Sequence, residues 1–103
     1  MKRYAVRLSP EAQTDLVLIH ANIAQQSGSL VTADDYLERI SSFLQSFDVF
    51  PERGTIRNEA RAGLRIVGFE GNASVAFIVE DESVVILRIA SKGQQLDFDE
   101  ATN

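Results

Sequence analysis

The chain has 103 residues and a mass of 11.4 kDa, which is the size of one domain with one hydrophobic core. Its 45% hydrophobic and 24% charged residues exclude a wholly disordered chain, and the absence of cysteine excludes a disulfide scaffold, a thiolate metal site and a cysteine nucleophile. The net charge of −5 excludes a protein that binds nucleic acid with its whole surface, so a phosphate-binding role requires a local patch.

The N-terminal segment is the first predicted element. Residues 2–8 alternate apolar and polar side chains, which predicts a strand with one buried side. Ser9 and Pro10 then predict a helix start, because the serine hydroxyl can accept an unpaired N–H and proline loses nothing at the first helical position. The segment is too interrupted by charge to be a signal peptide, and no apolar run approaches the ~20 residues that span a membrane. We therefore expect a cytoplasmic protein with no membrane partner.

Two helices joined by a short polar turn are predicted next. The first ends at residues 27–29, and the second begins at Thr32, with Asp35 completing a short capping box. Proline stops the second helix at Phe50-Pro51. The first helix carries a narrow apolar seam and the second a wide apolar stripe, so we expect them to pack antiparallel. The seam comprises Ala12, Leu16, Ile19 and Ile23. The stripe comprises Tyr36, Leu37, Ile40, Phe43, Leu44 and Phe47.

Strands are predicted in the second half of the chain, after a polar and irregular segment at residues 52–62. Gly71-Asn72 is a two-residue hairpin signal, and Val84 to Leu87 are apolar on both faces, which indicates an interior strand. The predicted strands are Leu64 to Phe69, Ala73 to Glu80 and Ser83 to Ala90. The order β-α-α-β-β-β predicts a two-layer α+β fold, a single domain over residues 1–103 with an N-terminal strand and a helical hairpin packed on an antiparallel sheet.

Short segments in a fixed order resemble a known family. They are Leu8-Ser9-Pro10-Glu11-Ala12 with Asp15-Leu16, then Tyr36-Leu37, Phe50-Pro51, Gly63-Leu64-Arg65, and Phe77-Ile78-Val79-Glu80-Asp81 running into Val85-Ile86-Leu87-Arg88-Ile89. In this order and spacing the chain resembles the ParE/RelE superfamily of type II toxins, and within it the ParE (plasmid-stabilisation) branch. The resemblance implies this same fold and a toxin held inactive by a cognate antitoxin whose C-terminal segment wraps over it. It implies inhibition of DNA gyrase for the ParE branch and cleavage of mRNA on the ribosome for the RelE branch.

The RelE-type reaction needs a general base, a general acid and cations, and the chain departs from that pattern. It has Ala73-Ser74 where the family usually carries Tyr-Arg, and residues 91–95 lack the usual His-Gly-Arg. We therefore assign no catalytic residue and favour a protein that acts by binding. Two alternatives stay open, namely a ribosome-dependent mRNA endonuclease and a degenerate toxin that only binds its antitoxin.

The histidine and the carboxylates offer no stronger site. His20 is the only histidine, and a surface or partner contact is a more common role for it than general base. No second histidine or cysteine accompanies it, so we expect no metal, and we expect no cofactor. The carboxylates cluster at Asp34, Asp35 and Glu38, at Glu80, Asp81 and Glu82, and at Asp97, Asp99 and Glu100. We interpret these as a helix N-terminus, a hairpin turn and an acidic tail.

Cations define the predicted target-binding patch. If the polar loop folds toward the end of the last strand, cations gather on a protein that is otherwise acidic. The predicted patch comprises Arg57, Arg61, Arg65, Arg88 and Lys92. The alternative is that the loop arginines pair with Glu52, Glu59 or Glu70 and brace the loop, in exposed pairs that contribute about 0–1 kcal/mol each.

A single helical hairpin cannot cover both faces of the predicted sheet. We expect the remaining apolar residues to bind the antitoxin in a hetero-oligomer, and we assign Leu18, Val67, Phe69 and Ile78 to that surface. The alternatives are a homodimer that covers these residues, or a packing register that buries them within the chain. The resulting hypothesis is a ParE-like toxin, neutralised by its antitoxin and acting on DNA gyrase, without sequence-specific DNA binding of its own.

Overall fold

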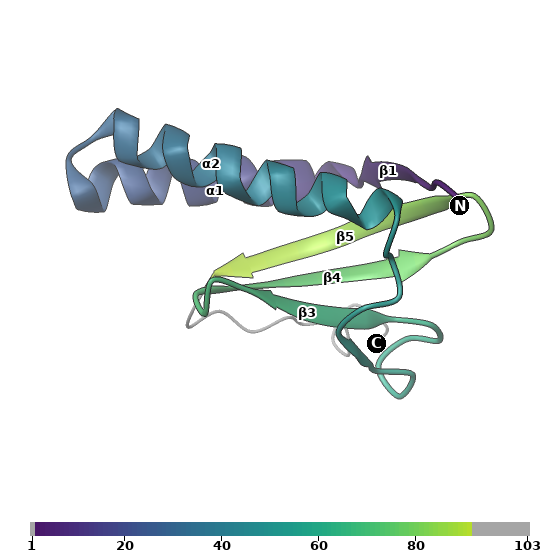
Figure 1. Ribbon diagram of the computed structural model, residues 1–103. Helices are drawn as coiled ribbons and strands as arrows, with labels where there is room; N and C mark the ends of the chain where they lie inside the picture. The colour runs from purple at the N-terminus through teal and green to yellow at the C-terminus, as the bar shows by residue number, and fades with distance from the viewer. Residues whose placement is uncertain (1, 92–103) are drawn as a thin grey trace.

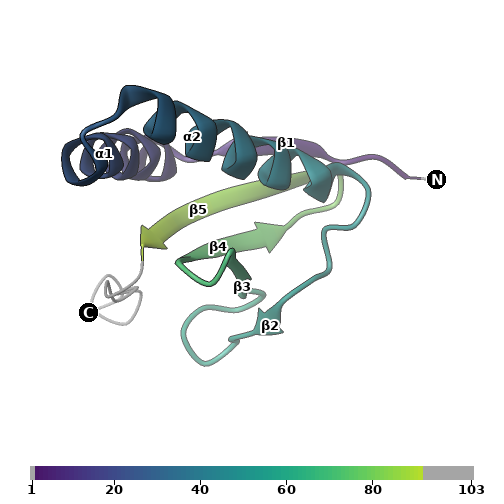
Figure 2. The same cartoon turned by 60° about the vertical axis from the view of Figure 1, so that its left-hand side comes forward.

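A five-stranded sheet carries two helices on one face, in the computed structural model, which describes residues 2–91 (Figures 1 and 2). The strand order is β1-β5-β4-β3-β2. The elements are β1 (Ala5–Leu8), α1 (Pro10–Ser27), α2 (Leu30–Gln45), a short 3₁₀ helix η1 (Ser46–Asp48), β2 (Thr55–Ile56), β3 (Arg65–Phe69), β4 (Ala73–Val79) and β5 (Ser83–Ser91). The predicted two-layer α+β fold is confirmed, and the segment predicted to be irregular contains the short strand β2.

The N-terminal strand corrects one part of the prediction. β1 pairs parallel with β5, with Val6 opposite Val84 and Leu8 opposite Ile86, whereas the other neighbouring strands are antiparallel. Alternation of polar and apolar residues is the same for both directions of pairing, so the sequence pattern could not show this. β5 lies between β1 and β4, which confirms the interior position predicted from its apolar run.

The helix ends follow from local chemistry, and both ends of α2 differ from the prediction. The Ser9 hydroxyl accepts from the Ala12 N–H at 3.0 Å, and Gly28 ends α1 in the left-handed conformation at φ 70°. α2 begins at Leu30, because the hydroxyl of Ser29 accepts from the N–H of Thr32 at 3.2 Å. Thr32 is thus not the cap, and α2 ends at Gln45, before the proline.

The β3–β4 turn lies one residue earlier than predicted. Its central residues are Glu70 and Gly71, with φ of 52° and 70°, and the Asn72 N–H donates to the Phe69 carbonyl at 3.1 Å. Two successive positive φ values are typical of the primed turns that suit hairpins. Asn72 stays outside the turn centre, and its side chain accepts a hydrogen bond from the Tyr36 hydroxyl at 3.1 Å.

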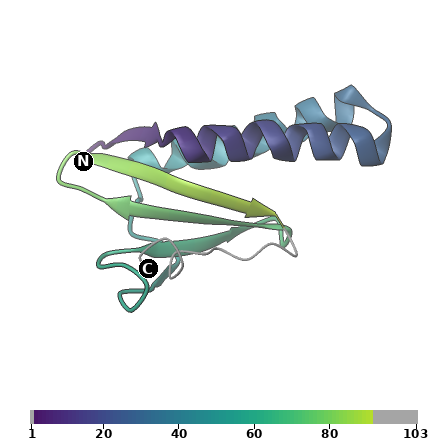
Figure 3. The same cartoon turned by 180° about the vertical axis from the view of Figure 1, so that it is seen from behind.

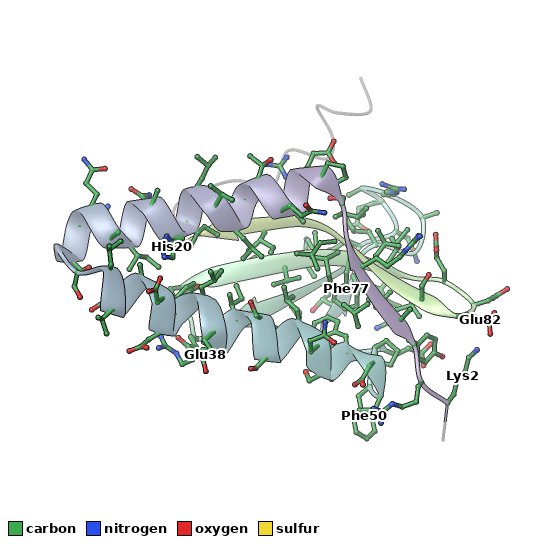
Figure 4. The ribbon with its side chains drawn as sticks, turned by 90° about the horizontal axis from the view of Figure 1, so that it is seen from above. Lys2, His20, Glu38, Phe50, Phe77 and Glu82 are labelled. Atoms are coloured by element: carbon green, nitrogen blue, oxygen red, sulfur yellow. The ribbon has the colours of Figure 1, made fainter. Side chains whose placement is uncertain are left out.

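The hydrophobic core fills the space between the helices and one face of the sheet. Phe47 and Phe77 meet edge to face with ring centroids 4.8 Å apart, and Phe77 lies in the layer beneath the two helices (Figure 4). The core comprises Ala12, Ile19, Tyr36, Ile40, Leu44, Phe47, Phe69, Ala73, Val75, Phe77, Val84, Ile86 and Ile89. Seam and stripe therefore meet over alternate residues of β4 and β5.

Candidate functional site

Two arginines project from the loop between β2 and β3. The Arg57 N–H donates to the Leu64 carbonyl at 2.7 Å, and the Gly63 N–H donates to Oδ1 of Asn58 at 2.8 Å, so the loop backbone is closed on itself. Arg57 and Arg61 are exposed. Within residues 2–91 neither forms an ion pair. This arrangement leaves two hydrated cations available to an anionic partner.

The base of this loop is held by Arg53. Its guanidinium carbon lies 4.4 Å from the ring centroid of Phe47, and its Nε and Nη2 donate to the carbonyls of Phe50 at 2.6 Å and Ser46 at 3.0 Å. Burial lowers the pKa of Arg53. Arg53 therefore has a structural role, and the neighbouring Arg65 lies partly exposed on β3, with Nη1 3.5 Å from the Arg53 carbonyl.

Arg88 is held in a different environment, at an irregularity in β5. Ala76 pairs with Arg88 and Phe77 with Ile86, so one extra residue forms a bulge in β5. Asp15 of α1 accepts from Arg88 Nε at 2.9 Å and Nη2 at 3.1 Å, and from the backbone N–H of Ile89 at 2.8 Å. The Asp15 side chain is only 11% exposed. Asp15 thus joins α1 to β5 beyond the end of β1, where the two elements run side by side (Figure 3).

The fold separates the arginine loop from the C-terminal end of β5, whereas Arg88 lies level with Ile66 across β4, because both pair with Ala76. Arg65 begins β3, opposite Phe77, whereas the C-terminal end of β5 lies level with the other end of β3, because Phe69 pairs with Ala73 and Ala73 with Ser91. The arginine loop consequently does not fold toward the end of the last strand. Lys92 lies outside the described residues. The alternative bracing pairs are not formed in the described part of the chain either, since Glu70 pairs with Arg39.

The residues assigned to the antitoxin do not form one surface. Leu18 is 61% exposed on α1. Phe69 is buried, with its ring 4.9 Å from that of Phe43, and Val67 packs against the same core. Ile78 lies on the other face of the sheet, because it alternates with Phe77 along β4. Phe69 therefore contributes no exposed surface.

Both helices of the hairpin carry exposed apolar side chains, of which the sequence pattern predicted Leu18 but not Leu30 and Val31. Val17 and Leu18 of α1 and Leu30 and Val31 of α2 are between 61% and 68% exposed. The signal was present, because Leu30 and Val31 are adjacent large aliphatics beside a helix cap. Leu30 and Val31 were instead expected to lie in the turn before a helix that begins at Thr32.

A groove lies between the helical hairpin and the β3–β4 turn. Its volume is about 440 Å³, and its lining includes Ile19, Ile23, Asp35, Tyr36, Arg39 and Asn72. Glu70 accepts from Arg39 Nε at 2.8 Å and Nη2 at 3.1 Å, which bridges α2 to the turn. Burial, followed by the Glu70 charge, raises the pKa of Tyr36.

His20 takes part in a contact within the hairpin. Its Nε2 lies 2.7 Å from Oδ1 of Asp34, which joins α1 to α2. Among residues 2–91, no three histidine or acidic side chains are grouped so that they could hold a metal ion. In the same part of the chain, no helix combines the length and apolar character needed to cross a bilayer. The acidic tail of the sequence analysis lies outside the described residues.

The comparisons with known proteins identify the family. Residues 6–96 match the family described as the ParE toxin of the type II toxin–antitoxin system parDE. The structure is similar to a chain of the chromosomal ParDE toxin–antitoxin system from P. aeruginosa, with a TM-score of 0.75, 21% identity, and coverage of 87% of this chain and 97% of that one. It is also similar to a chain of the toxin–antitoxin complex RelBE2 from Mycobacterium tuberculosis, with a TM-score of 0.62, 21% identity, and coverage of 87% and 99%.

No curated protein sequence matches the chain. The fold is that of the ParE/RelE class of small toxins. The chain belongs to the ParE toxin family of type II toxin–antitoxin systems, as the resemblance of its short segments implied.

Proposed function

We propose that this toxin is held inactive in the cytoplasm by a cognate antitoxin, in a hetero-oligomer, and that the free chain inhibits DNA gyrase by binding. The observation that carries the proposal is the family match across residues 6–96. Binding is favoured over RelE-type catalysis because Ala73-Ser74 replaces the aromatic and cationic pair common in the family, and Ala73 is a core residue.

The helical hairpin supports the antitoxin part of the proposal. Exposed apolar side chains on a small protein commonly mark an interface, and both helices of the hairpin carry them, Val17 and Leu18 on α1 and Leu30 and Val31 on α2. The adjoining groove adds polar groups that can orient a bound segment. We propose that the antitoxin covers this hairpin surface. Ile78, on the other face, remains a secondary assignment.

The arginine loop supports the target part of the proposal. Arg57 and Arg61 carry it, because they are exposed and form no ion pair within residues 2–91. Arg65 begins the adjoining strand. Arg88 is a weaker candidate for contact with the target, because its guanidinium group already donates to Asp15. Charge complementarity at such a loop favours an acidic partner surface.

The test is induction of the chain in bacteria, alone and together with the gene beside it. Filamentation with a DNA-damage response, accompanied by loss of supercoiling by purified gyrase, supports the proposal. Rapid transcript cleavage on ribosomes would assign the endonuclease function instead, and normal growth would assign the degenerate toxin. Arg57→Ala with Arg61→Ala is expected to relieve toxicity. Arg3→Ala with Arg7→Ala, which removes two exposed arginines of the N-terminal segment, serves as the matched control.

A further inference from the structure

The two edges of the sheet differ in how their backbone groups are satisfied. β1 forms one edge and β2 the other, and Figure 2 shows β2 at the margin farthest from the helices. An edge strand presents unpaired N–H and C=O groups, which can bind another strand unless the chain satisfies them. On β1 the Tyr4 N–H donates to the Asp48 carbonyl at 2.8 Å, and the Gln13 side chain donates to the Leu8 carbonyl at 3.1 Å. The chain therefore closes the β1 edge at both ends of the strand.

The outer edge of β2 is open. The Arg57 N–H donates to the Leu64 carbonyl at 2.7 Å, and the preceding residue, Ile56, lies opposite Arg65. Hydrogen-bonded and non-hydrogen-bonded pairs alternate in an antiparallel ladder, so the N–H and C=O of Ile56 point away from β3. Residues 54–59 are all exposed, and within residues 2–91 Ile56 makes no backbone hydrogen bond outside the β2–β3 ladder. A further strand can consequently add at this edge.

The side chains beside this edge specify the chemistry of an added strand. Ile56 is 48% exposed, and its neighbour Arg57 points to the other side of the strand. The Arg61 N–H donates to the Arg57 carbonyl at 3.2 Å, which holds the second loop arginine beside the first. Directly opposed residues of neighbouring strands share a face. An added strand would thus place an aliphatic side chain against Ile56 and a carboxylate against Arg57.

The charge of the region favours an acidic occupant. Residues 52–65 contain four of the ten lysines and arginines but only two of the fifteen aspartates and glutamates, so they are positive on a chain of net charge −5. Among residues 2–91 no ion pair engages Arg57 or Arg61. We infer that the β2 edge binds an extended acidic protein segment by strand addition, and that carboxylates alternate with aliphatic side chains along that segment.

A second copy of the chain fits this edge less well. Antiparallel pairing of two copies, centred on Ile56, would place both Arg57 side chains on one face of the joint sheet, as diagonal neighbours of like charge. A nucleic acid would meet few exposed cations on a chain of net negative charge, and it would leave the aliphatic side chain of Ile56 without a matching partner.

Strand addition also gives the arginine loop a way to recognise the target. The edge groups of Ile56 would supply main-chain hydrogen bonds, and Arg57 and Arg61 would select carboxylates. The identification of this edge with the target-binding surface rests on the proposed function, whereas the strand addition itself does not.

Binding of a short peptide to the full-length chain tests the strand addition. The probe is a blocked peptide of alternating valine and glutamate, and the amide chemical shifts and hydrogen exchange of the isotope-labelled chain are measured. We expect the largest shifts at residues 54–58 and slower exchange of the Ile56 N–H, which becomes hydrogen-bonded. One control peptide has lysine in place of glutamate. The other carries N-methyl groups on its valines, which removes the N–H groups that would face β2. Both controls should bind several-fold more weakly.

The double variant Arg57→Ala with Arg61→Ala tests the selection by charge. Both side chains are exposed, so the variant should fold and bind the glutamate peptide several-fold more weakly, and added salt should weaken binding to the natural chain. Arg3→Ala with Arg7→Ala removes two exposed cations from the segment that leads into β1 and from β1 itself. This matched control should leave the affinity unchanged.

Several outcomes overturn the inference. No shift at residues 54–58 up to the solubility limit of the glutamate peptide, or equal binding of either control peptide, would show that no acidic strand is added. A dimer in sedimentation, with the Ile56 N–H already protected in the free chain, would assign the edge to a second copy. Shifts at residues 54–58 with a single-stranded oligonucleotide but not with the peptide would assign it to nucleic acid. Because none of these readouts uses toxicity or gyrase, they separate failure of the strand addition from failure of the proposed function.

Discussion

The arginine loop and the bulge of β5 both carry arginine side chains, but they hold them in opposite environments. In the loop, Arg57 and Arg61 are exposed and form no ion pair among residues 2–91. At the bulge, Arg88 donates two hydrogen bonds to Asp15, which also accepts the Ile89 N–H. The first arrangement leaves the guanidinium groups available to a partner, whereas the second uses one to orient a carboxylate inside the fold.

The difference teaches that a cluster of cations in a sequence does not predict a cluster in space. The direction and register of the strands determine which cations lie close together. A carboxylate on a helix, Asp15, determines which of them already forms an ion pair within the fold. We therefore expect substitutions at the bulge to change stability, and substitutions at the tip of the loop to change partner binding with stability preserved.

Gly54, directly before β2, is the position where the largest loss of stability is expected. Gly54 has a φ of +77°, and a Cβ there would overlap the carbonyl oxygen of Ile66. Gly54→Ala combines left-handed strain of about 1–2 kcal/mol with a backbone clash, so we expect it to lower the free energy of unfolding by about 3 kcal/mol or more. Urea unfolding of the purified variant measures this loss.

Gly63 provides the matched control for Gly54. It has the same φ of +77°, but a Cβ there would meet no heavy atom within 4 Å. Gly63→Ala should therefore cost only the conformational strain, about 1–2 kcal/mol. Equal losses for the two variants would show that the close approach of Gly54 to β3 is not what fixes the loop.

Asp15→Ala is the next largest expected loss and tests the bulge. The substitution leaves the Ile89 N–H buried without its acceptor, which costs about 1–3 kcal/mol. Asp15→Asn keeps an oxygen acceptor and removes the charge, so it should cost less. Asp34→Ala removes an exposed carboxylate that also contacts another helix and should change the unfolding free energy by about 0–1 kcal/mol. If all three variants unfold alike, Asp15 does not hold α1 to β5.

A combined assay of stability and toxicity distinguishes the structural role of Arg88 from the proposed binding role of Arg57 and Arg61. Arg88→Ala should lower the unfolding free energy by about 1 kcal/mol, because its side chain is 46% exposed and solvent screens the pair. The double variant Arg57→Ala with Arg61→Ala should change stability by no more than about 0.5 kcal/mol and relieve toxicity. A toxic double variant would remove the loop from the target surface.

Local chemistry explains what the sequence could predict. Ser9 and Pro10 fixed the start of α1, and the spacing of Ala12, Ile19 and Ile40 identified residues that are now buried. These signals act over a few residues, and each agrees with the fold. The shift at Ser29 arose because two nearby hydroxyl residues can both cap a helix.

Long-range pairing explains what the sequence left out. Asp15 occupies a seam position between Ala12 and Ile19, and a carboxylate there is a signal that a partner exists. The partner lies 73 residues further along the chain, so no spacing rule could name it. The parallel direction of β1 and the separation of the loop from the end of β5 are likewise properties of the topology.

The pair of Arg39 and Glu70 provides the smallest expected effect and sharpens the comparison with Asp15. It has the same bidentate geometry but joins an exposed helix surface to a turn. The hydrogen bond from Arg39 lowers the pKa of Glu70. A lowered pKa in the folded state means that the stabilisation is fully present above the unfolded value, about 4.3, and is lost as the pH falls through the folded value.

The measurement is the difference in unfolding free energy between the natural chain and Glu70→Gln, followed from neutral to acidic pH. We expect a small difference that is constant above about pH 5 and shrinks below about pH 4. Asp15→Asn provides the contrast, because its larger cost at neutral pH includes contacts made inside the fold. A difference for Glu70→Gln that grows as the pH falls would have the wrong sign, and the pair would then not be what lowers the pKa of Glu70.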